Sequence, residues 1–379
     1  MLKIMTVVGT RPELIKLSRV ISELDRNSSQ VLVHAGQNFD YELNLIFFEQ
    51  LAIRRPDEFL EAGGGSAMET IARVLTRGDA VLEKHRPDAV LILGDTNSCL
   101  VAIAAKRRKI PVFHMEAGNR CFDQRVPEEI NRRIVDHVSD VNLTYTEHAR
   151  RYLLAEGLAP ETVIKTGSPM KEVIRHYREG IDASKVLEQL GLQARRYIVV
   201  SAHREENVDV PERLAALVDS VNALAFTHDL PVVFSVHPRT RKRLAAAPEL
   251  VLDERVRAIA PLGFLDYIKL QMESFCVVSD SGTITEESGL LGFPAVTIRQ
   301  AHERPEGMDE GTLIMCDLSA DRVREAVRVV TEQVFRDGAK FRTPADYEPD
   351  NVSSKVLRII VSYVDYVRRT VWFDREASP

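Results

Sequence analysis

Residues 3–17 read KIMTVVGTRPELIKL, so a short apolar run ends at Gly9 and a helix-like pattern follows it. Apolar residues then recur at helical spacing from Leu14 to Leu24. Pro12 suits the first turn of that helix, where the N–H that proline lacks would have no partner within the helix. The stretch therefore predicts a buried strand, a tight turn and a helix, the repeating unit of an α/β fold.

The same unit recurs along the chain. Apolar, β-branched runs, each followed by a polar or glycine turn, predict strands at 3–9, 30–36, 89–94, 112–118, 141–145 and 163–167, and again at 197–201, 232–236, 256–261, 275–279, 295–298 and 313–316. Continuous apolar strands that alternate with helices indicate parallel sheets covered on both faces. The segment 167–180 carries turn-forming residues, Gly-Ser-Pro at its start and Gly at its end, as expected of a domain boundary. We therefore expect an α/β fold of two Rossmann-like domains, residues 1–168 and 169–351.

A last helix is expected within residues 352–379, from Val352 to Trp372. Apolar residues recur at helical spacing along it, at Val356, Ile360, Val364, Val367 and Val371. Such a stripe indicates a helix with one buried face.

The composition excludes several classes of protein. The 379 residues carry 50 Lys and Arg against 56 Asp and Glu, a formal charge of −6, and only 6% are aromatic. Nucleic-acid surfaces need clustered positive charge and stacking rings, so we expect no nucleic-acid partner. No apolar run approaches the ~20 residues of a membrane span, and the first is too short for a signal peptide. We therefore expect a cytoplasmic protein with no membrane partner.

The cysteines and histidines do not indicate a metal site. The 4 cysteines form no CxxC pair, and the 10 histidines form no HExxH motif. We expect no metal. The chain also lacks GxGxxG, Walker A and YxxxK motifs, which argues against a nucleotide kinase and against epimerisation through a bound nicotinamide.

Arg11 and Lys16 flank the start of the first helix. A helix N-terminus beside two cations suits an anionic ligand. The alternative is a solvated Arg and a surface Lys, and this motif alone does not choose between them.

Two acidic residues follow neighbouring predicted strands. Asp95 lies in GDTNS at 94–98, and Glu116 lies in HMEAG at 114–118. Strand ends of a parallel sheet share one edge, which is where ligands bind in such folds. Carboxylates brought together there can supply both an acid and a base. Alternatively, Asp95 only caps a helix and Glu116 pairs with Arg120.

Residues 127–132, PEEINR, predict a helix that starts with proline and places Glu128 one turn before Arg132. Acidic residues in a first turn and a Glu–Arg pair at this spacing are routine helix stabilisation. By itself the motif is a weak functional signal.

The second half repeats the pattern of polar strand ends. His203 and His237 each follow a strand, where a histidine can neutralise a diphosphate or simply be a satisfied core residue. The most diagnostic turn is Ser281-Gly282-Thr283, between a strand and a helix that contains Glu287. Backbone N–H groups and the helix dipole favour phosphate there, and Glu287 is placed to accept hydrogen bonds from a ribose. Ordinary N-capping is the alternative.

Taken together, these motifs carry a family resemblance that covers nearly the whole chain. The set GTRPELIK, GDTNS, HMEAG, PEEINR, SAHREEN, DSGTITEE and HERPEG, in this order and spacing, resembles the non-hydrolysing UDP-N-acetylglucosamine 2-epimerases. Residues 116–123 (EAGNRCFD) and 301–307 (AHERPEG) are similar to the branch that converts UDP-2-acetamido-2,6-dideoxy-L-talose to UDP-N-acetyl-L-fucosamine for surface polysaccharides.

The resemblance implies a GT-B architecture of two domains with a cleft between them, and a last helix that crosses back to the first domain. It implies anti elimination of UDP, re-addition with inversion at carbon 2, no cofactor, a UDP-sugar substrate and a homodimer. The acid/base roles of the family fall on Asp95, Glu116 and Glu128, with His203 also counted as catalytic. The substrate-binding roles fall on Arg11, Lys16, Arg132, His203, Tyr267, Ser281, Gly282, Thr283 and Glu287.

The chain departs from the family at residues 36–40, GQNFD, where many members have GQHRE. In those members the region helps to hold a second, activating substrate molecule, so the resemblance does not extend to that activation. The first alternative is a 2-epimerase that converts UDP-N-acetylglucosamine to UDP-N-acetylmannosamine. Three rivals of other activity also remain from sequence: a glycosyltransferase, a non-catalytic nucleotide-sugar sensor, and a relative that hydrolyses UDP-sugar.

Overall fold

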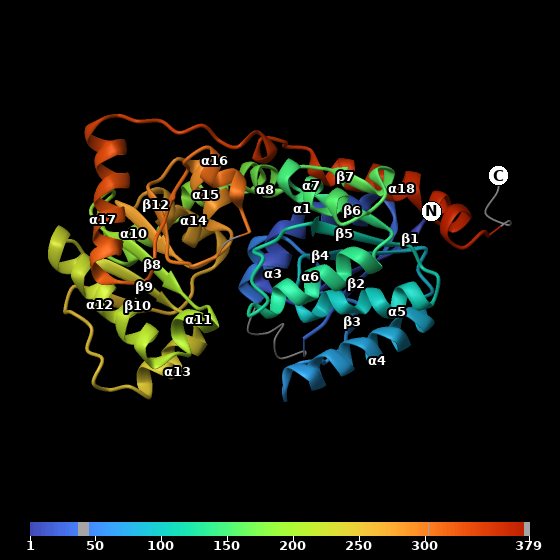
Figure 1. The fold of residues 1–379 in the computed structure, drawn as a ribbon, viewed down its shortest axis with the longest axis horizontal. Coiled ribbons are helices and arrows are strands. Elements are labelled where there is room, and N and C mark those ends of the chain that lie inside the picture. The colour runs from blue at the N-terminus through green and yellow to red at the C-terminus, as the bar shows by residue number, and fades with distance from the viewer. Residues whose placement is uncertain (37–44, 302, 375–379) are drawn as a thin grey trace. The chain divides into compact units, whose positions relative to one another are not determined.

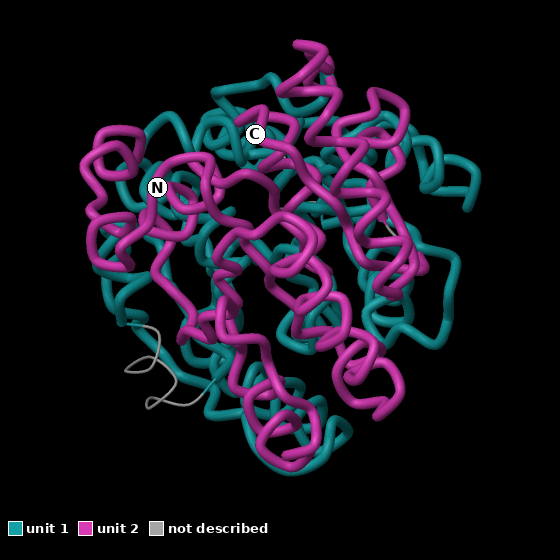
Figure 2. Tube along the Cα trace, turned by 90° about the vertical axis from the view of Figure 1, so that its left-hand side faces the viewer, with its two compact units in different colours: residues 1–176, 345–379 teal, residues 177–344 magenta. Residues whose placement is uncertain are grey.

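The computed structural model describes residues 1–36, 45–301 and 303–374. The chain divides into two compact units, residues 1–176 with 345–379, and residues 177–344 (Figure 2). The divisions fall at 176/177 and 344/345, whereas the sequence placed them at 168/169 and 351/352. The first differs because the helix Met170–His176 packs on the first helix of unit 1.

Unit 1 is built on a parallel sheet of order β3-β2-β1-β4-β5-β6-β7 (Figure 1). Its strands are β1 (Lys3–Val8), β2 (Ser29–His34), β3 (Glu58–Phe59), β4 (Ala89–Leu93), β5 (Val112–Ala117), β6 (Val141–Thr144) and β7 (Val163–Lys165). The central strands are almost wholly buried, because helices cover both faces of a parallel sheet. The edge strand β3 was not predicted, since a strand of 2 residues has no apolar pattern to detect.

The helices of unit 1 follow the predicted alternation. They are α1 (Arg11–Asn27), α3 (Leu45–Gln50), α4 (Ala67–His85), η1 (Asn97–Leu100), α5 (Val101–Arg107), α6 (Pro127–Val138), α7 (Glu147–Ala155), η2 (Pro160–Thr162), α8 (Met170–His176), η4 (Ala345–Tyr347) and α18 (Val352–Val371).

The last helix, α18, packs against α1 within unit 1 (Figure 1). Val356, Ile360, Val364 and Val367 are buried, as the stripe predicts. The prediction was wrong for Val371, which is 41% exposed. Val371 is the final residue of the helix, one turn beyond the last buried position, so its side chain extends past the packed face.

Unit 2 contains a second parallel sheet, of order β10-β9-β8-β11-β12-β13. Its strands are β8 (Ile198–Ala202), β9 (Val232–Val236), β10 (Val256–Ile259), β11 (Cys276–Ser279), β12 (Ala295–Thr297) and β13 (Ile314–Met315). Its helices are α9 (Arg178–Ala183), α10 (Val186–Gln189), α11 (Glu205–Val208), α12 (Pro211–His228), α13 (Pro238–Ala245), α14 (Phe264–Met272), α15 (Ile284–Leu291), α16 (Pro305–Asp309), α17 (Ala320–Thr331) and η3 (Glu332–Arg336).

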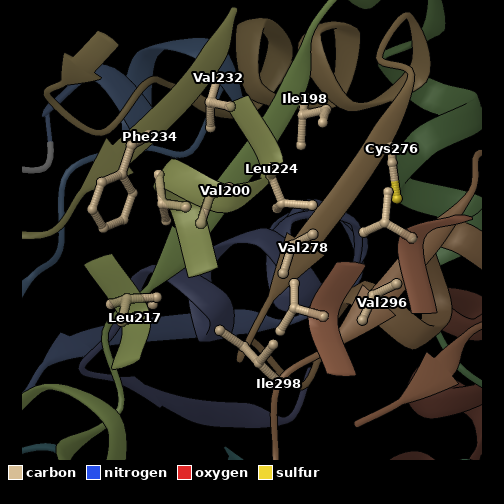
Figure 3. Packing of buried hydrophobic residues seen from close by; sticks show 14 of the residues in the cluster. Ile198, Val200, Leu217, Leu224, Val232, Phe234, Cys276, Val278, Val296 and Ile298 are labelled. Atoms are coloured by element: carbon tan, nitrogen blue, oxygen red, sulfur yellow. The ribbon is translucent and has the colours of Figure 1, made fainter. Parts of the chain in front are cut away.

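The core of unit 2 joins α12 and α17 to one face of this sheet. Figure 3 shows Leu217 and Leu224 of α12 among the side chains of strands β8, β9 and β11, with Val200, Phe234 and Val278 labelled. Burial of such side chains contributes roughly 1.5–3 kcal/mol each, so this core holds the strand ends in fixed positions. The α/β class with parallel sheets is therefore as predicted. Within the described part of the chain, no helix is long and apolar enough to span a membrane.

Candidate functional site

The strongest local feature of unit 1 is the pair formed by Lys16 and Glu116. Lys16 Nζ lies 2.6 Å from Glu116 Oε2, and the Lys16 side chain is only 3% exposed. The ammonium also lies 5.6 Å from the ring centroid of Tyr145. Lys16 is thus not a surface lysine, because burial, a carboxylate and an aromatic face all fix its ammonium.

Glu116 itself has an unusual backbone. Its φ is +63°, a left-handed value, and the register with β6 shifts between Met115 and Ala117. A residue with a β-carbon adopts this conformation only where the surroundings enforce it, which is common at functional sites. The irregularity turns the Glu116 side chain toward Lys16 at the carboxyl end of β5. The alternative partner Arg120 instead binds Asp136 and Glu156.

Asp95 follows β4 and is held by α6. Arg132 Nε donates to Asp95 Oδ2 at 3.0 Å, while Arg132 Nη1 donates to Glu129 Oε2 at 2.9 Å. Arg132 is 4% exposed, so this guanidinium is a buried link between the two carboxylates. The structure therefore brings the predicted residues Asp95 and Arg132 together. Asn131 strengthens the same link by donating to the Asp95 carbonyl at 3.0 Å.

The two acidic residues at the start of α6 differ in environment. Glu129 is fully buried and accepts from the Cys121 N–H at 3.0 Å, so it fixes the segment that follows β5. Glu128, the predicted acid/base residue, is half-buried in the first turn of the helix. Of these two glutamates, only Glu128 has a side chain that is partly exposed and could contact a ligand.

Glu13 is a residue that the sequence analysis missed. One of its carboxylate oxygens accepts from the Gly9 N–H at 2.5 Å, and the other accepts from Thr10 Oγ1 at 3.0 Å and Thr96 Oγ1 at 2.7 Å. Burial raises the pKa of Glu13 to about 7, although the hydrogen bonds from Thr96, Gly9 and Thr10 oppose the shift. Glu13 joins the loop after β1 to the loop that carries Asp95.

Arg11 begins α1, and its guanidinium lies 5.3 Å from the ring centroid of Phe47. Partial burial lowers the pKa of Arg11 from its usual value. The group nevertheless stays cationic, since arginine loses its proton only at very high pH.

In unit 2, Asp280 organises the predicted phosphate site. Its buried carboxylate accepts from the N–H groups of His203 at 3.0 Å and Arg204 at 3.0 Å, and from Asn207 Nδ2 at 3.1 Å. His203 Nδ1 also lies 3.2 Å from Asp280 Oδ1, and the His203 side chain is 41% exposed. A buried carboxylate thus fixes the position of a half-exposed imidazole.

Residues 281–283 form the turn between β11 and α15. Ser281 N–H donates to Ser279 Oγ at 3.0 Å, and the hydroxyls of Ser281 and Thr283 lie 3.0 Å apart. Thr283 is the N-cap of α15 but makes no side-chain capping hydrogen bond. Capping by Ser281 or Thr283 was the alternative considered from sequence. The Thr283 hydroxyl is not used in this way, whereas Ser281 Oγ accepts from the Thr283 N–H at 3.4 Å.

Glu287 and Tyr267 come together on the far side of that turn. Gln271 Nε2 donates to Glu287 Oε2 at 2.8 Å, and Glu287 is 7% exposed. Burial and the nearby Glu287 carboxylate raise the pKa of Tyr267 well above its usual value, while a hydrogen bond with Ser201 opposes the shift. Gln271 was not predicted, and it fixes the Glu287 side chain.

Two buried ion pairs involve residues that follow the turn in sequence. Arg299 binds Glu303 through two hydrogen bonds of 2.8 and 2.9 Å, and Arg304 Nη2 lies 3.1 Å from Glu286 Oε2. A β-carbon on Gly282 would lie 3.8 Å from Glu303 Oε2, so the turn contacts the first pair. Glu303 and Arg304 could have been found from the AHERPEG stretch, in which both lie. His302 of that stretch and residues 37–40 of GQNFD lie outside the described residues.

No group of three or more His, Cys, Asp or Glu that could hold a metal ion occurs among the residues that the structure describes. The chemistry that the described groups support is acid/base and electrostatic. Unit 1 presents carboxylates paired with buried cations at strand ends, and unit 2 presents a hydroxyl-lined turn at a helix start beside His203.

Comparisons with known proteins agree with one another. A family model described as UDP-N-acetylglucosamine 2-epimerase matches residues 22–361. The UDP-2,3-diacetamido-2,3-dideoxy-D-glucuronate 2-epimerase of Pseudomonas aeruginosa is 35% identical over 342 residues, which cover 89% of this chain and 94% of the relative.

Two solved structures are similar over nearly the whole chain. The structure of UDP-N-acetylglucosamine 2-epimerase from Rickettsia bellii has 53% identity and a TM-score of 0.92, and covers 99% of this chain and 100% of that one. The Methanocaldococcus jannaschii UDP-GlcNAc 2-epimerase in complex with UDP-GlcNAc and UDP has 31% identity and a TM-score of 0.88, with 95% and 99% covered. These similarities confirm the predicted α/β fold with two parallel sheets of GT-B type.

Proposed function

Because the chain belongs to the UDP-N-acetylglucosamine 2-epimerase family, an isomerase family, we propose that it inverts carbon 2 of a UDP-N-acetylhexosamine by elimination and re-addition of UDP. The observation that carries this proposal is the buried Lys16–Glu116 pair at the left-handed backbone of Glu116. A buried cation 2.6 Å away stabilises the anionic carboxylate, the form required of a base.

The proposed reaction has two reversible steps. A carboxylate removes the proton from carbon 2, the C–H electrons form a double bond to carbon 1, and the bond from carbon 1 to the UDP oxygen breaks. UDP then adds back to carbon 1 while an acid delivers a proton to the opposite face of carbon 2. Glu116, Asp95 and Glu128 are proposed as the acid/base groups, and Lys16 and Arg132 as the cations that hold Glu116 and Asp95.

Binding of UDP is proposed for residues of unit 2, and the family resemblance also assigns Arg11 to the diphosphate. The Ser281–Thr283 turn presents two hydroxyls to a phosphate at the start of α15, and the half-exposed imidazole of His203 adds a polar contact. Glu287, held by Gln271, accepts from the ribose hydroxyls, and Tyr267 lies beside it for the uracil ring. Charge neutralisation of departing UDP lowers the barrier to elimination.

The proposed hexosamine is UDP-2-acetamido-2,6-dideoxy-L-talose, supported by residues 116–123 and 301–307. A second candidate, UDP-N-acetylglucosamine, is supported by the names of the matched family and of the Rickettsia bellii structure. The test is NMR of each sugar nucleotide incubated with the protein. Conversion of the talose derivative to the fucosamine derivative supports the first candidate, and conversion of UDP-N-acetylglucosamine to its C2 epimer supports the second.

Other outcomes of the same experiment would refute epimerisation. Free UDP and free sugar accumulating without a UDP-linked product would indicate hydrolysis, and turnover only with an added acceptor would indicate a glycosyltransferase. UDP binding with no turnover of either sugar would indicate a sensor.

We propose further that the protein acts in the cytoplasm, and that it forms a homodimer, as the family resemblance implies. Light scattering coupled to size-exclusion chromatography tests the assembly. A mass near twice the 42.7 kDa of the chain is expected, and a mass of one chain at every concentration tested would refute the dimer.

A further inference from the structure

A buried histidine that the proposed chemistry does not use lies between the two loops that carry Asp95 and Glu116. His114 belongs to β5 and is 0% exposed. Its Nε2 lies 2.7 Å from the Gly94 carbonyl oxygen, and its Nδ1 lies 2.9 Å from Asp136 Oδ1. One nitrogen therefore faces the loop after β4, and the other faces α6.

Both of these neighbours are acceptors. A carbonyl oxygen cannot donate a hydrogen bond, so the contact with Gly94 requires an N–H on Nε2. Nδ1 lies within ion-pair distance of the Asp136 carboxylate but is not aligned for a hydrogen bond with it. A neutral imidazole would therefore leave the Nδ1 lone pair 2.9 Å from an anionic oxygen, in a site without access to water. The imidazolium form instead places a positive charge beside this anion.

The charges around His114 alternate in sign. Arg120 Nη1 donates to Asp136 Oδ2 at 2.7 Å, and Arg120 also binds Glu156 at 2.8 and 2.7 Å. His114⁺, Asp136⁻, Arg120⁺ and Glu156⁻ thus form a chain with no net charge, which lowers the cost of burying each member. We refer to these four side chains as the His114 network.

The charged groups that face the imidazole come from three elements. Asp136 lies on α6, Asp95 follows β4, and Arg120 reaches the site from the segment after β5 through Asp136. Burial alone lowers the pKa of His114, but Asp136, the Gly94 carbonyl and Asp95 outweigh it and raise the pKa above the usual 6.5. The ion-pair distance to Asp136 and these electrostatics both favour the charged imidazole.

The network is attached to both proposed catalytic loops. Gly94 immediately precedes Asp95, and the Asp136 oxygens accept from the Gly118 N–H at 3.2 Å, just beyond Glu116. Gly118 has a left-handed φ of +82°, and a β-carbon there would lie 2.5 Å from the Ala149 carbonyl oxygen, so the backbone of this loop packs closely against α7.

We infer that His114, in its doubly protonated form, is a positioning residue that fixes the backbone next to Asp95 and next to Glu116 through one buried group. The inference rests on the proposed function for its catalytic consequence. The charge state of His114 and its hold on the loops do not depend on that function, and they are measured separately.

The first test measures the protonation of the His114 imidazole. Nitrogen-15 NMR of histidine-labelled protein, with the His114 signals assigned by their absence in His114→Gln, is expected to show both ring nitrogens protonated at neutral pH. A neutral tautomer at neutral pH would overturn the inference. Asp136→Asn removes the anion and should move the deprotonation of His114 to lower pH, and an unchanged titration would also overturn it.

The second test measures amide hydrogen exchange in the two loops and the rate of turnover. In His114→Gln, amide hydrogen exchange at residues 94–98 and 116–118 should accelerate, and kcat should fall by about 10²-fold, the usual result of a misplaced catalytic group, with KM little changed. In the wild type, loss of the His114 proton at high pH should release the two loops and lower kcat. This fall of kcat at high pH should be absent in His114→Gln. If His114→Gln does not fold, Asp136→Asn serves for the same three measurements.

A matched control separates positioning from general loss of stability. His85 also contacts a carboxylate, Glu58 Oε1 at 2.7 Å, but on α4 beside β3. His85→Gln should leave kcat, its pH profile and exchange at both loops unchanged. Slow exchange retained at both loops in His114→Gln would refute the positioning role. If the wild type turns over no UDP-sugar, the proposed function fails while the NMR and exchange results still decide the inference.

Discussion

Replacing Glu13 by Gln should remove a distinctive pH dependence from the stability of unit 1. The Glu13 carboxyl is 2% exposed, and burial raises its pKa from 4.5 to about 7. Gln has the same shape and never ionises. The variant therefore isolates the free energy of ionising a buried carboxyl from that of packing it.

The sign and size follow from proton linkage. Between pH 4.5 and about 7 the folded state keeps the Glu13 proton while the unfolded state loses it, so the free energy of unfolding of the wild type falls as the pH rises. A difference of 7 − 4.5 = 2.5 pKa units at 1.36 kcal/mol per unit gives about 3 kcal/mol. Below 4.5 and above 7, this residue contributes no pH dependence.

The assay uses the single tryptophan of the chain. Trp372 follows α18 in unit 1, so its fluorescence reports the unfolding of that unit in urea. The stability of Glu13→Gln relative to wild type should rise by about 3 kcal/mol between about pH 4.5 and about pH 8. The intrinsic cost of the substitution cancels, because it is the same at both pH values.

Glu83→Gln is the matched control, because the Glu83 side chain is 68% exposed on α4 of the same unit. Its stability relative to wild type should hardly change with pH. A flat difference for Glu13→Gln as well would show that Glu13 ionises normally, and would refute the account of the loop that it joins to Asp95.

Three further predictions concern the site. Glu287→Ala should weaken UDP binding by about 1–3 kcal/mol, the worth of a hydrogen-bond acceptor of this kind, without unfolding the protein; calorimetry with UDP checks this, and unchanged affinity would remove Glu287 from the ribose site. Glu116→Gln should lower kcat by roughly 10²-fold or more with UDP affinity retained, whereas nearly normal turnover measured by NMR would exclude it as acid or base. Gly118→Ala should destabilise unit 1 by more than 1 kcal/mol, because its β-carbon would lie 2.5 Å from a carbonyl oxygen; wild-type urea unfolding of this variant would contradict the backbone geometry.

Much of the fold could be predicted because buried parallel strands are apolar along their whole length. The strand at 232–236 was predicted with its observed bounds, and the others differ mainly at their ends, where the polar turns begin. The short edge strand β3 and the exposure of Val371 could not be predicted, because both depend on what the rest of the chain leaves uncovered.

The site was predictable only where a strand end carries an unusual residue. Asp95 and Glu116 are visible in this way. Lys16 and Arg132 were noticed at the starts of two predicted helices, but that they pair with Glu116 and Asp95 is seen only in the structure. Glu13 was overlooked, since an acidic residue in a first helical turn is ordinary. Its burial depends on Thr96, which lies 83 residues away in sequence.

The same limit applies to Asp280 and Gln271. Each supports a predicted residue from inside unit 2, and sequence does not reveal that the Asp280 carboxylate is directed at the N–H groups of His203 and Arg204. Supporting residues of this kind are defined by tertiary contacts, which a single sequence does not display.

The central claim, that carbon 2 loses and regains a proton during turnover, is tested by NMR of the reaction in deuterated water. Elimination and re-addition through side-chain acids and bases predict deuterium at carbon 2 of the product, because the proton removed from one face is not the one returned to the other. Glu116→Gln should lose this incorporation together with turnover. Epimerised product that carries no deuterium at carbon 2 would contradict the account and require an internal route for the hydrogen.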